Sequence, residues 1–268
     1  MFPRLFDLGP ITVYTYGVFL AAAYLLGLKI ALVRASKRGL ETARVMDLGI
    51  YLIIAALVGA KLLLLVVDFQ YFKENPRDLF TLVRSGGVFY GGLLVALAVA
   101  FWYIRRHRLP IWTTTDAFAP GIALGHVVGR VGCLMAGCCF GKPASVPWAV
   151  TFTDPFAASN VGTPLGVPLH PTQLYEAGAE LLILGILIVS ERRARIFPGR
   201  TFWLYILLYG ISRFIIEFYR GDERGMLAGL STSQWISIVL VPLSLVMLAR
   251  LRRTAASAPA PAVSRRRA

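Results

Sequence analysis

Arg130 is the residue of this sequence with the clearest reason to do chemistry. It belongs to the segment 129–141 (GRVGCLMAGCCFG), inside a stretch that is otherwise apolar from Ala117 onward and long enough to cross a bilayer. An arginine at the middle of a membrane helix costs roughly 2.5–3.5 kcal/mol on insertion scales, so it usually faces a wet cavity, a partner charge or an anionic ligand. Arg130 is therefore a candidate site residue.

A second polar group follows a helical spacing in the segment 209–220. Its members, four, four and three residues apart, are Tyr209, Arg213, Glu217 and Arg220. This spacing predicts one polar face of a helix. One carboxylate between two arginines leaves one positive charge over, which favours a ligand-binding stripe. The alternative is an internal ion pair that holds helices together.

Two further segments carry polar residues or glycines at predicted helix starts. The segment 170–176 (HPTQLYE) begins a helix after Pro171, and its His, Gln, Tyr and Glu could line the mouth of a site or anchor the interface. The segment 86–92 has four glycines in seven residues, which predicts a re-entrant or cavity-lining turn.

The three cysteines all lie between positions 133 and 139, so no extracytoplasmic disulfide framework is expected. Neighbouring cysteines without nearby histidines make poor zinc ligands, and we expect no metal site. As small apolar groups they could simply pack, and the sequence leaves open whether they are reactive thiols.

The composition identifies the elements that must position these residues. The chain has 268 residues, 57% hydrophobic and 16% charged, with a mean hydropathy of +0.66, which indicates an all-α integral membrane protein. Seven apolar stretches are long enough to span as helices. They are 11–33, 47–67, 86–104, 113–140, 173–190, 201–218 and 232–249.

The net charge of +14 does not indicate nucleic acid, because Lys and Arg alternate between loops: 17 lie in one set of loops and seven in the other. The positive-inside rule places the N-terminus outside and the C-terminus in the cytoplasm. The first stretch has the reverse of a signal peptide's charge order and should be a retained helix. We expect one membrane domain over 1–250 and a disordered basic cytoplasmic tail over 251–268.

Together these blocks resemble the prolipoprotein diacylglyceryl transferase family. The resemblance rests on Gly-Arg-Val-Gly at 129–132, on 170–176 and on 209–220, in that order along a seven-helix plan. It implies a multi-pass enzyme of the bacterial inner membrane that needs no cofactor. Its substrates would be phosphatidylglycerol among the membrane lipids and the lipobox cysteine of a prolipoprotein.

In the implied reaction a thiolate attacks the glycerol carbon next to the phosphate, and glycerol 1-phosphate leaves. Arg130 and Arg213, expected at similar depth, would bind the phosphate between them. Glu217 would hold Arg213. The other residues to which the resemblance gives a substrate-binding role are Tyr16, Tyr209, His170, Gln173, Gly87 and Gly91.

The sequence departs from the best-known members of the family at four positions. Cys133, Ala136 and Cys138 replace two asparagines and a glutamate, and Tyr90 replaces a histidine often proposed as the base. A tyrosine is a weak base near neutrality, so Tyr90 would donate a hydrogen bond to a lipid oxygen. We hypothesise that His126, one turn before Arg130 on the same face, partly takes over as base. The alternative is a packed histidine bonded to a carbonyl.

Two other functions are compatible with the same residues. One is a paralogous lipid-group transferase with a different acceptor, suggested by the altered signature. The other is a non-enzymatic protein that binds or transports an anionic lipid. Transporters usually contain an internal repeat, and none is found between 1–130 and 131–268.

Overall fold

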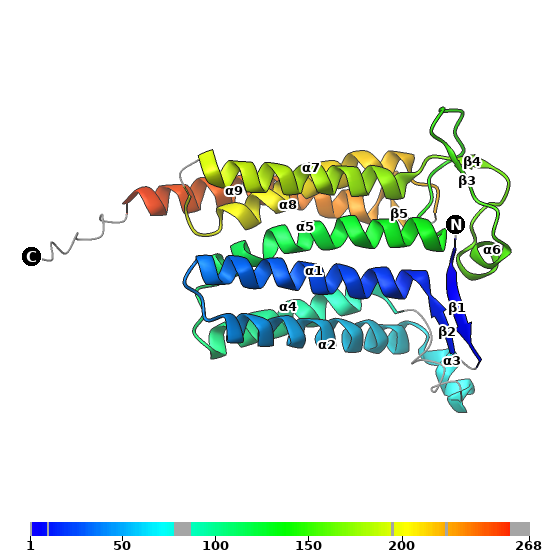
Figure 1. Cartoon of the computed structure of the whole chain (residues 1–268), viewed down its shortest axis with the longest axis horizontal. Coiled ribbons are helices and arrows are strands. Elements are labelled where there is room, and N and C mark those ends of the chain that lie inside the picture. The colour runs from blue at the N-terminus through cyan, green and yellow to red at the C-terminus, as the bar shows by residue number, and fades with distance from the viewer. Residues whose placement is uncertain (1, 10, 78–86, 194–195, 223–224, 258–268) are drawn as a thin grey trace, which may run out of the picture. The chain divides into compact units, whose positions relative to one another are not determined.

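The computed structural model describes residues 2–9, 11–77, 87–193, 196–222 and 225–257 (Figure 1). In that part of the chain, seven helices are long and apolar enough to cross a membrane, which confirms the predicted all-α fold with seven spans. These helices are α1 (Thr15–Lys37), α2 (Thr42–Val67), α4 (Phe89–Arg106), α5 (Ile111–Ala136), α7 (Thr172–Arg193), α8 (Arg200–Ile216) and α9 (Thr232–Ser257).

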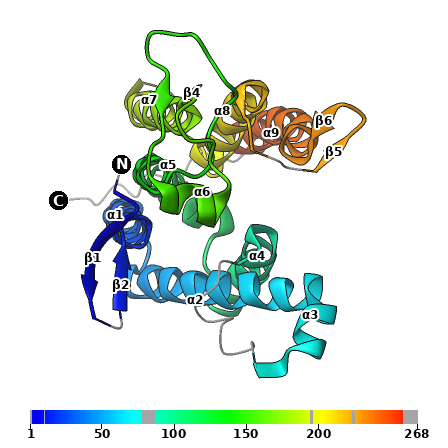
Figure 2. The same cartoon turned by 90° about the vertical axis from the view of Figure 1, so that its right-hand side faces the viewer.

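Short elements connect the spans. The helical ones are α3 (Phe69–Glu74), α6 (Pro155–Val161) and the 3₁₀ turn η2 (Glu217–Tyr219). The described residues also form three antiparallel strand pairs: β1 (Arg4–Leu8) with β2 (Ile11–Tyr14), β3 (Val150–Thr151) with β4 (Pro168–Leu169), and β5 (Met226–Leu227) with β6 (Leu230–Ser231). The β5–β6 hairpin lies at the start of α9 (Figure 2).

Several helix ends differ from the predicted spans, and for three of them the local sequence gives the cause. Residues 11–14 form β2 and pair with β1, so α1 begins at Thr15; this Ile-Thr-Val-Tyr run is β-branched and aromatic, as strands prefer. α5 ends at Ala136 instead of 140, because Gly137 adopts a left-handed conformation (φ 79°) that terminates the helix. α9 continues to Ser257, past the tail boundary expected at 250.

The extension of α9 has a local cause. Leu, Arg and Ala are good helix formers, and no proline interrupts the sequence between Pro242 and Pro259. The rest of the predicted tail, 258–268, lies outside the described residues.

The chain forms two compact units. One combines Met1–Ala31 with Thr115–Ala268, and the other is Leu32–Thr114. In the first unit α8 packs against both α7 and α9, and α1 approaches α5 closely at Gly27. A Cβ added to Gly27 on α1 would lie only 2.8 Å from the carbonyl oxygen of Gly121 on α5. In the second unit α2 packs along α4.

Candidate functional site

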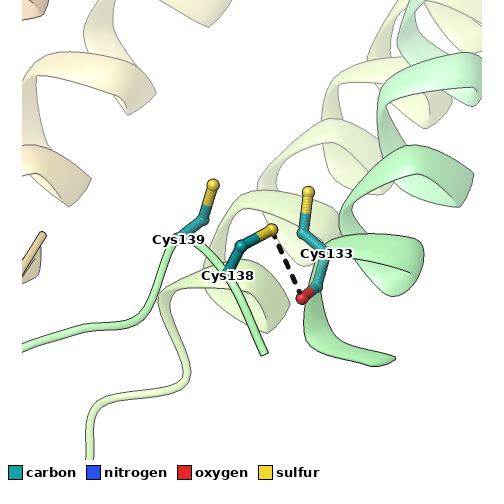
Figure 3. A group of neighbouring side chains, drawn as sticks. All are labelled: Cys133, Cys138 and Cys139. Atoms are coloured by element: carbon teal, nitrogen blue, oxygen red, sulfur yellow. Dashed lines mark hydrogen bonds between the residues drawn. The ribbon is translucent and has the colours of Figure 1, made fainter. Parts of the chain in front are cut away.

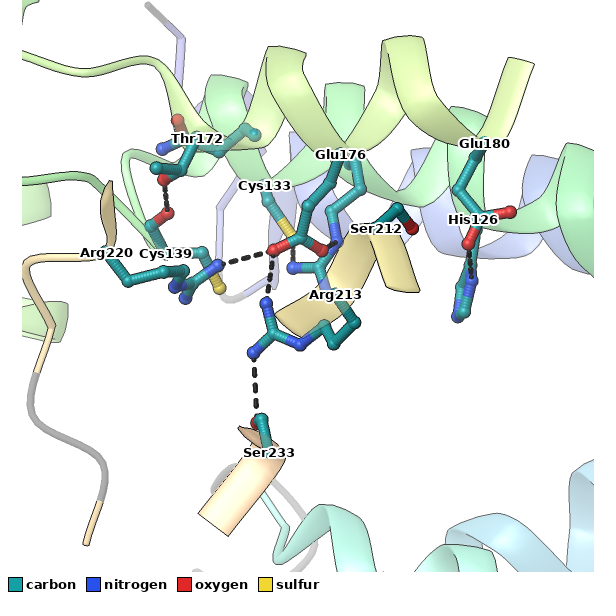
Figure 4. Close-up of polar contacts among 12 residues, drawn as sticks. His126, Cys133, Cys139, Thr172, Glu176, Glu180, Ser212, Arg213, Arg220 and Ser233 are labelled. Carbon is teal, nitrogen blue, oxygen red and sulfur yellow. Dashed lines mark hydrogen bonds and ion pairs between the residues drawn. The ribbon is translucent and has the colours of Figure 1, made fainter. Parts of the chain in front are cut away.

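A buried carboxylate, Glu176, lies at the centre of the polar residues in the first unit (Figure 4). The Nε atom of Arg130 lies 2.6 Å from its Oε2 atom. Its Oε1 atom accepts from Nη1 of Arg213 at 2.7 Å and from Nη1 of Arg220 at 3.0 Å. Helices α5, α7 and α8 and the segment after η2 therefore meet at one acid. Arg130 and Arg213 do come together, as predicted, but a side chain of the protein holds them.

Arg213 and Arg220 also have partners other than Glu176. Arg213 pairs with Glu217 at 2.7 Å and donates from Nη2 to Ser233 on α9 at 3.1 Å. Arg220 donates from Nε and Nη2 to the two carboxylate oxygens of Asp222, at 2.8 and 2.7 Å. The predicted role of Glu217 in holding Arg213 is therefore matched by a direct ion pair.

The prediction of one surplus positive charge was wrong. It placed Glu217 between Arg213 and Arg220, but α8 ends at Ile216 and the chain then turns through η2, so Arg220 leaves the helical face. Arg220 pairs instead with Glu176 and Asp222. In the described part of the chain, three guanidiniums thus share three carboxylates.

The three arginines differ in access. The side chain of Arg130 is 19% exposed, compared with 6% for Arg213 and 3% for Arg220. Next to Arg130, a Cβ added to Gly129 would meet nothing within 4 Å. Arg130 is therefore the arginine that can present donors to an incoming anion, while Arg213 and Arg220 are held inside the network.

His126 on α5 forms a second pair with a residue of α7, one turn away from the pair of Arg130 and Glu176. Its Nδ1 atom lies 2.8 Å from Oε1 of Glu180 and 3.1 Å from the hydroxyl oxygen of Tyr205. The side chain of His126 is 38% exposed and that of Glu180 only 3%. His126 is thus bonded to a carboxylate, where the alternative had expected a backbone carbonyl.

The loop after α5 is held by buried side chains at three successive carbonyls. Thr163, Gln173 and Thr172 donate to the carbonyl oxygens of Gly137 (2.8 Å), Cys138 (2.7 Å) and Cys139 (2.7 Å) respectively. Gln173, predicted to bind substrate, is fully buried and makes this contact. The loop therefore has a fixed course beside the start of α7.

This loop brings the cysteine sulfurs together. The Sγ atoms of Cys133, Cys138 and Cys139 all lie within 4.8 Å of one another (Figure 3). Hydrogen bonds from Cys133 and Cys138, followed by the nearby guanidiniums of Arg220 and Arg130, lower the pKa of the Cys139 thiol, although burial opposes this shift.

His170 lies at an aromatic hollow and not in the acid–arginine network. Its Nδ1 atom is 3.1 Å from the hydroxyl oxygen of Tyr175, which accepts at 2.7 Å from Trp148. These three side chains, with Tyr219 and residues of α7 and α8, line a cavity of about 650 Å³ with mostly apolar walls.

The two tyrosines predicted to bind head-group oxygens lie beside the network helices. Tyr209 on α8 stacks on Tyr205 (5.9 Å between ring centroids) and lies 5.4 Å from the His126 ring. Tyr16 on α1 is 40% exposed, and a Cβ added to Gly132 on α5 would lie 3.6 Å from its ring. Both positions allow the predicted role, which stays a prediction.

Three of the predicted site residues, Tyr90, Gly87 and Gly91, belong to the second unit. Tyr90 is 39% exposed and packs edge-on against Phe89. A Cβ added to Gly87 would lie 2.8 Å from Ala60 on α2, and Gly91 on α4 closely approaches Gly59 on α2, so both glycines allow close packing against α2. Gly86, the first residue of the predicted glycine-rich turn, lies outside the described residues.

The sequence pattern suggested Glu176 only as a residue that could line the mouth of a site or anchor the interface, and it did not suggest Glu180 at all. A signal was available: both are carboxylates inside the predicted span 173–190, and an ionisable residue within a span is a site candidate by the argument applied to Arg130. Their spacing of four residues puts them on one face of α7. That face meets Arg130 and His126, which are also four residues apart on α5.

Comparisons with known proteins support the sequence resemblance. The profile of the family described as prolipoprotein diacylglyceryl transferase matches residues 3–250. A Clostridium tetani protein named phosphatidylglycerol–prolipoprotein diacylglyceryl transferase is 37% identical over 90% of this chain and 94% of its own length. Proteins of the same name from Synechococcus elongatus and Corynebacterium diphtheriae are each 30% identical. They match 98% and 92% of this chain, and 92% and 91% of their own lengths. A match over nearly all of the chain, on a fold with seven potential membrane spans, shows that the chain belongs to the prolipoprotein diacylglyceryl transferase family.

Proposed function

We propose that this chain transfers the diacylglyceryl group of phosphatidylglycerol to a cysteine thiol of a prolipoprotein, and that the thiol is the lipobox cysteine. The observation that supports this most directly is the arginine network on Glu176, in a chain whose relatives carry that activity in their names. In the reaction a sulfur–carbon bond forms, the carbon–oxygen bond of the phosphate ester breaks, and its electron pair stays on the phosphate oxygen.

Arg130 is the residue we assign to the phosphate. Its Nε atom is engaged by Glu176, which fixes the plane of the guanidinium, and the side chain is still 19% exposed. A held guanidinium can stabilise the charge that develops on the leaving phosphate without reorganising. Arg213 would act through Glu176 and Glu217 and reach the phosphate only if the ligand displaces part of this network.

His126 is the base we assign to the thiol proton. If Nδ1 donates to Glu180, the ring is oriented and a proton would be accepted at Nε2. The aromatic cavity at His170 has apolar walls that suit an acyl chain of the lipid. Tyr16 and Tyr209 keep the head-group roles inferred from the resemblance.

We place the protein in the bacterial inner membrane with the N-terminus outside, because the loop charges follow the positive-inside rule and the relatives are bacterial. In this orientation α5 and α8 both run outward, so the network and the cysteine loop lie toward the outer face.

The test is mass spectrometry of a lipobox peptide incubated with the purified chain in phosphatidylglycerol membranes. We expect a mass increase of one diacylglyceryl group, absent when the acceptor cysteine is serine and absent with Arg130→Gln. Lipid cleavage without peptide modification would indicate a transferase with another acceptor. Phosphatidylglycerol binding without covalent change would indicate a lipid-binding or transport protein.

A further inference from the structure

We propose that Cys133, Cys138 and Cys139 form a binding site for a soft monovalent metal ion, with Cu(I) as the ion that fits best. The sequence pattern predicted no metal here because it lacks histidines. The folded geometry is the reason for the new inference, which is independent of the transfer reaction.

The sulfur positions are close to those of a three-coordinate site. A metal–sulfur bond is about 2.3 Å, so three sulfurs in a plane around one ion lie about 4 Å apart. In the structure all three Sγ atoms are already within 4.8 Å of one another. Cys133 approaches from the last turn of α5, and the other two come from the loop that follows (Figure 3). Small side-chain rotations would bring the sulfurs onto an ion.

The loop that carries two of the cysteines is fixed in advance. Its carbonyls are held by the buried side chains of Thr163, Gln173 and Thr172. Cys139 has a φ of 63°, in the left-handed region that non-glycine residues rarely adopt. Such strain persists where the surroundings determine it, and it is common at ligand sites.

Ligand type and number select the ion. Thiolates are soft ligands that favour Cu(I) and Zn(II) among the available metals. Structural zinc is almost always bound by four ligands, whereas the group of possible ligands found among the described residues consists of these three cysteines. Three thiolates around Cu(I) carry a net negative charge. Arg130, whose Nη1 lies 4.0 Å from the Cys133 sulfur, would reduce the cost of that charge.

The experiment uses the full chain, purified in detergent, reduced and freed of metal. Cu(I) is titrated into it in competition with a chromophoric Cu(I) chelator. We expect one equivalent to be taken from the chelator, and we expect this uptake to be lost in Cys133→Ser, Cys138→Ser and Cys139→Ser. The control is His107→Gln in the second unit, which removes a possible adventitious ligand and should leave uptake unchanged.

A second measurement avoids substitution. The chain contains three cysteines in all, so alkylation followed by mass spectrometry counts the thiols of this cluster alone. Cu(I) should protect all three, and removal of the metal should restore them. Uptake that persists in the serine variants would overturn the proposal. The absence of Cu(I) uptake by the reduced protein would also overturn it. This holds even if two of the thiols form a disulfide when the protein is left in air. Retention of Zn(II) in place of Cu(I) would overturn the assignment of the ion.

Discussion

Arg130 and Glu176 form an ion pair of 2.6 Å between α5 and α7, and the same helices carry a second pair one turn away. There, His126 and Glu180 lie 2.8 Å apart. The two helices are antiparallel, and on each of them the two polar residues are four positions apart. When one pair meets, the other pair is therefore brought together as well. The first pair connects to the arginines of α8 and of the segment after η2, and the second to Tyr205. A guanidinium and an imidazole are thereby held on one side of α5, each by its own carboxylate.

Glu176→Gln should destabilise the fold and abolish transfer. The change leaves Arg130, Arg213 and Arg220 without the shared negative charge, and loss of one partner of a buried ion pair costs roughly 3–5 kcal/mol. Unfolding in detergent, followed by circular dichroism, measures the stability. The matched control is Glu41→Gln, which makes the same chemical change in the exposed ion pair with Arg44. It should lower the stability by at most about 1 kcal/mol. Equal stability losses in the two variants would contradict a central role for Glu176.

Lysine substitution should separate the arginines by function. Arg130→Lys keeps the charge but loses the planar fork, so we expect the transfer rate to fall by about a hundredfold or more. The protein should stay folded, because this side chain is partly exposed. Arg220→Lys breaks the two-point contact with Asp222 at a side chain that is 3% exposed, so its main effect should be on stability. Steady-state rates and thermal unfolding of both variants test this. The opposite pattern, an active Arg130→Lys and a stable, inactive Arg220→Lys, would exchange their roles.

His126→Ala and Glu180→Gln should both lower the transfer rate, the first more strongly. His126→Ala removes the base itself, whereas Glu180→Gln leaves the imidazole in place with a weaker orienting hydrogen bond. The rate of a base-dependent step also depends on pH, and we expect His126→Ala to flatten that dependence while Glu180→Gln keeps it. Rates across a pH series, at saturating phosphatidylglycerol, provide the measurement. If His126→Ala retains the parent rate and pH profile, the histidine is a packing residue.

The sequence was sufficient to predict the seven spans, because each is a long apolar stretch whose signal does not depend on its neighbours. It also indicated Arg130, Arg213 and His126 as candidates, since charged or titratable residues in apolar spans are conspicuous. Pairing between helices is different: whether Arg213 meets Glu217 alone or also Glu176 depends on how α7 packs against α8.

The cysteines illustrate the same limit at a shorter range. The predicted span 113–140 placed all three in a helix, which would turn Cys133 and Cys139 away from each other. The left-handed turn at Gly137 ends α5 and reverses the chain, and only this turn brings Cys139 back to Cys133. A glycine near a span end was visible in the sequence, but the point at which the helix stops was not.

Gly141 and Gly129 should respond oppositely to alanine, although both belong to the signature segment. A Cβ at Gly141 would lie 2.6 Å from the Cβ of His170 and 2.8 Å from the Tyr219 carbonyl oxygen, so Gly141→Ala should destabilise the protein by roughly 1–3 kcal/mol. A Cβ at Gly129 meets nothing within 4 Å, and alanine there favours the helix by up to about 1 kcal/mol.

The functional effect of Gly129→Ala distinguishes packing from substrate access. Because Gly129 precedes Arg130 and faces open space, a lipid head group that reaches Arg130 should pass close to it. We therefore expect Gly129→Ala to be at least as stable as the parent but to need more phosphatidylglycerol for half-maximal transfer. Thermal unfolding and the concentration dependence of transfer measure the two effects separately. Unchanged lipid dependence in a stable Gly129→Ala protein would mean that the head group approaches Arg130 from elsewhere.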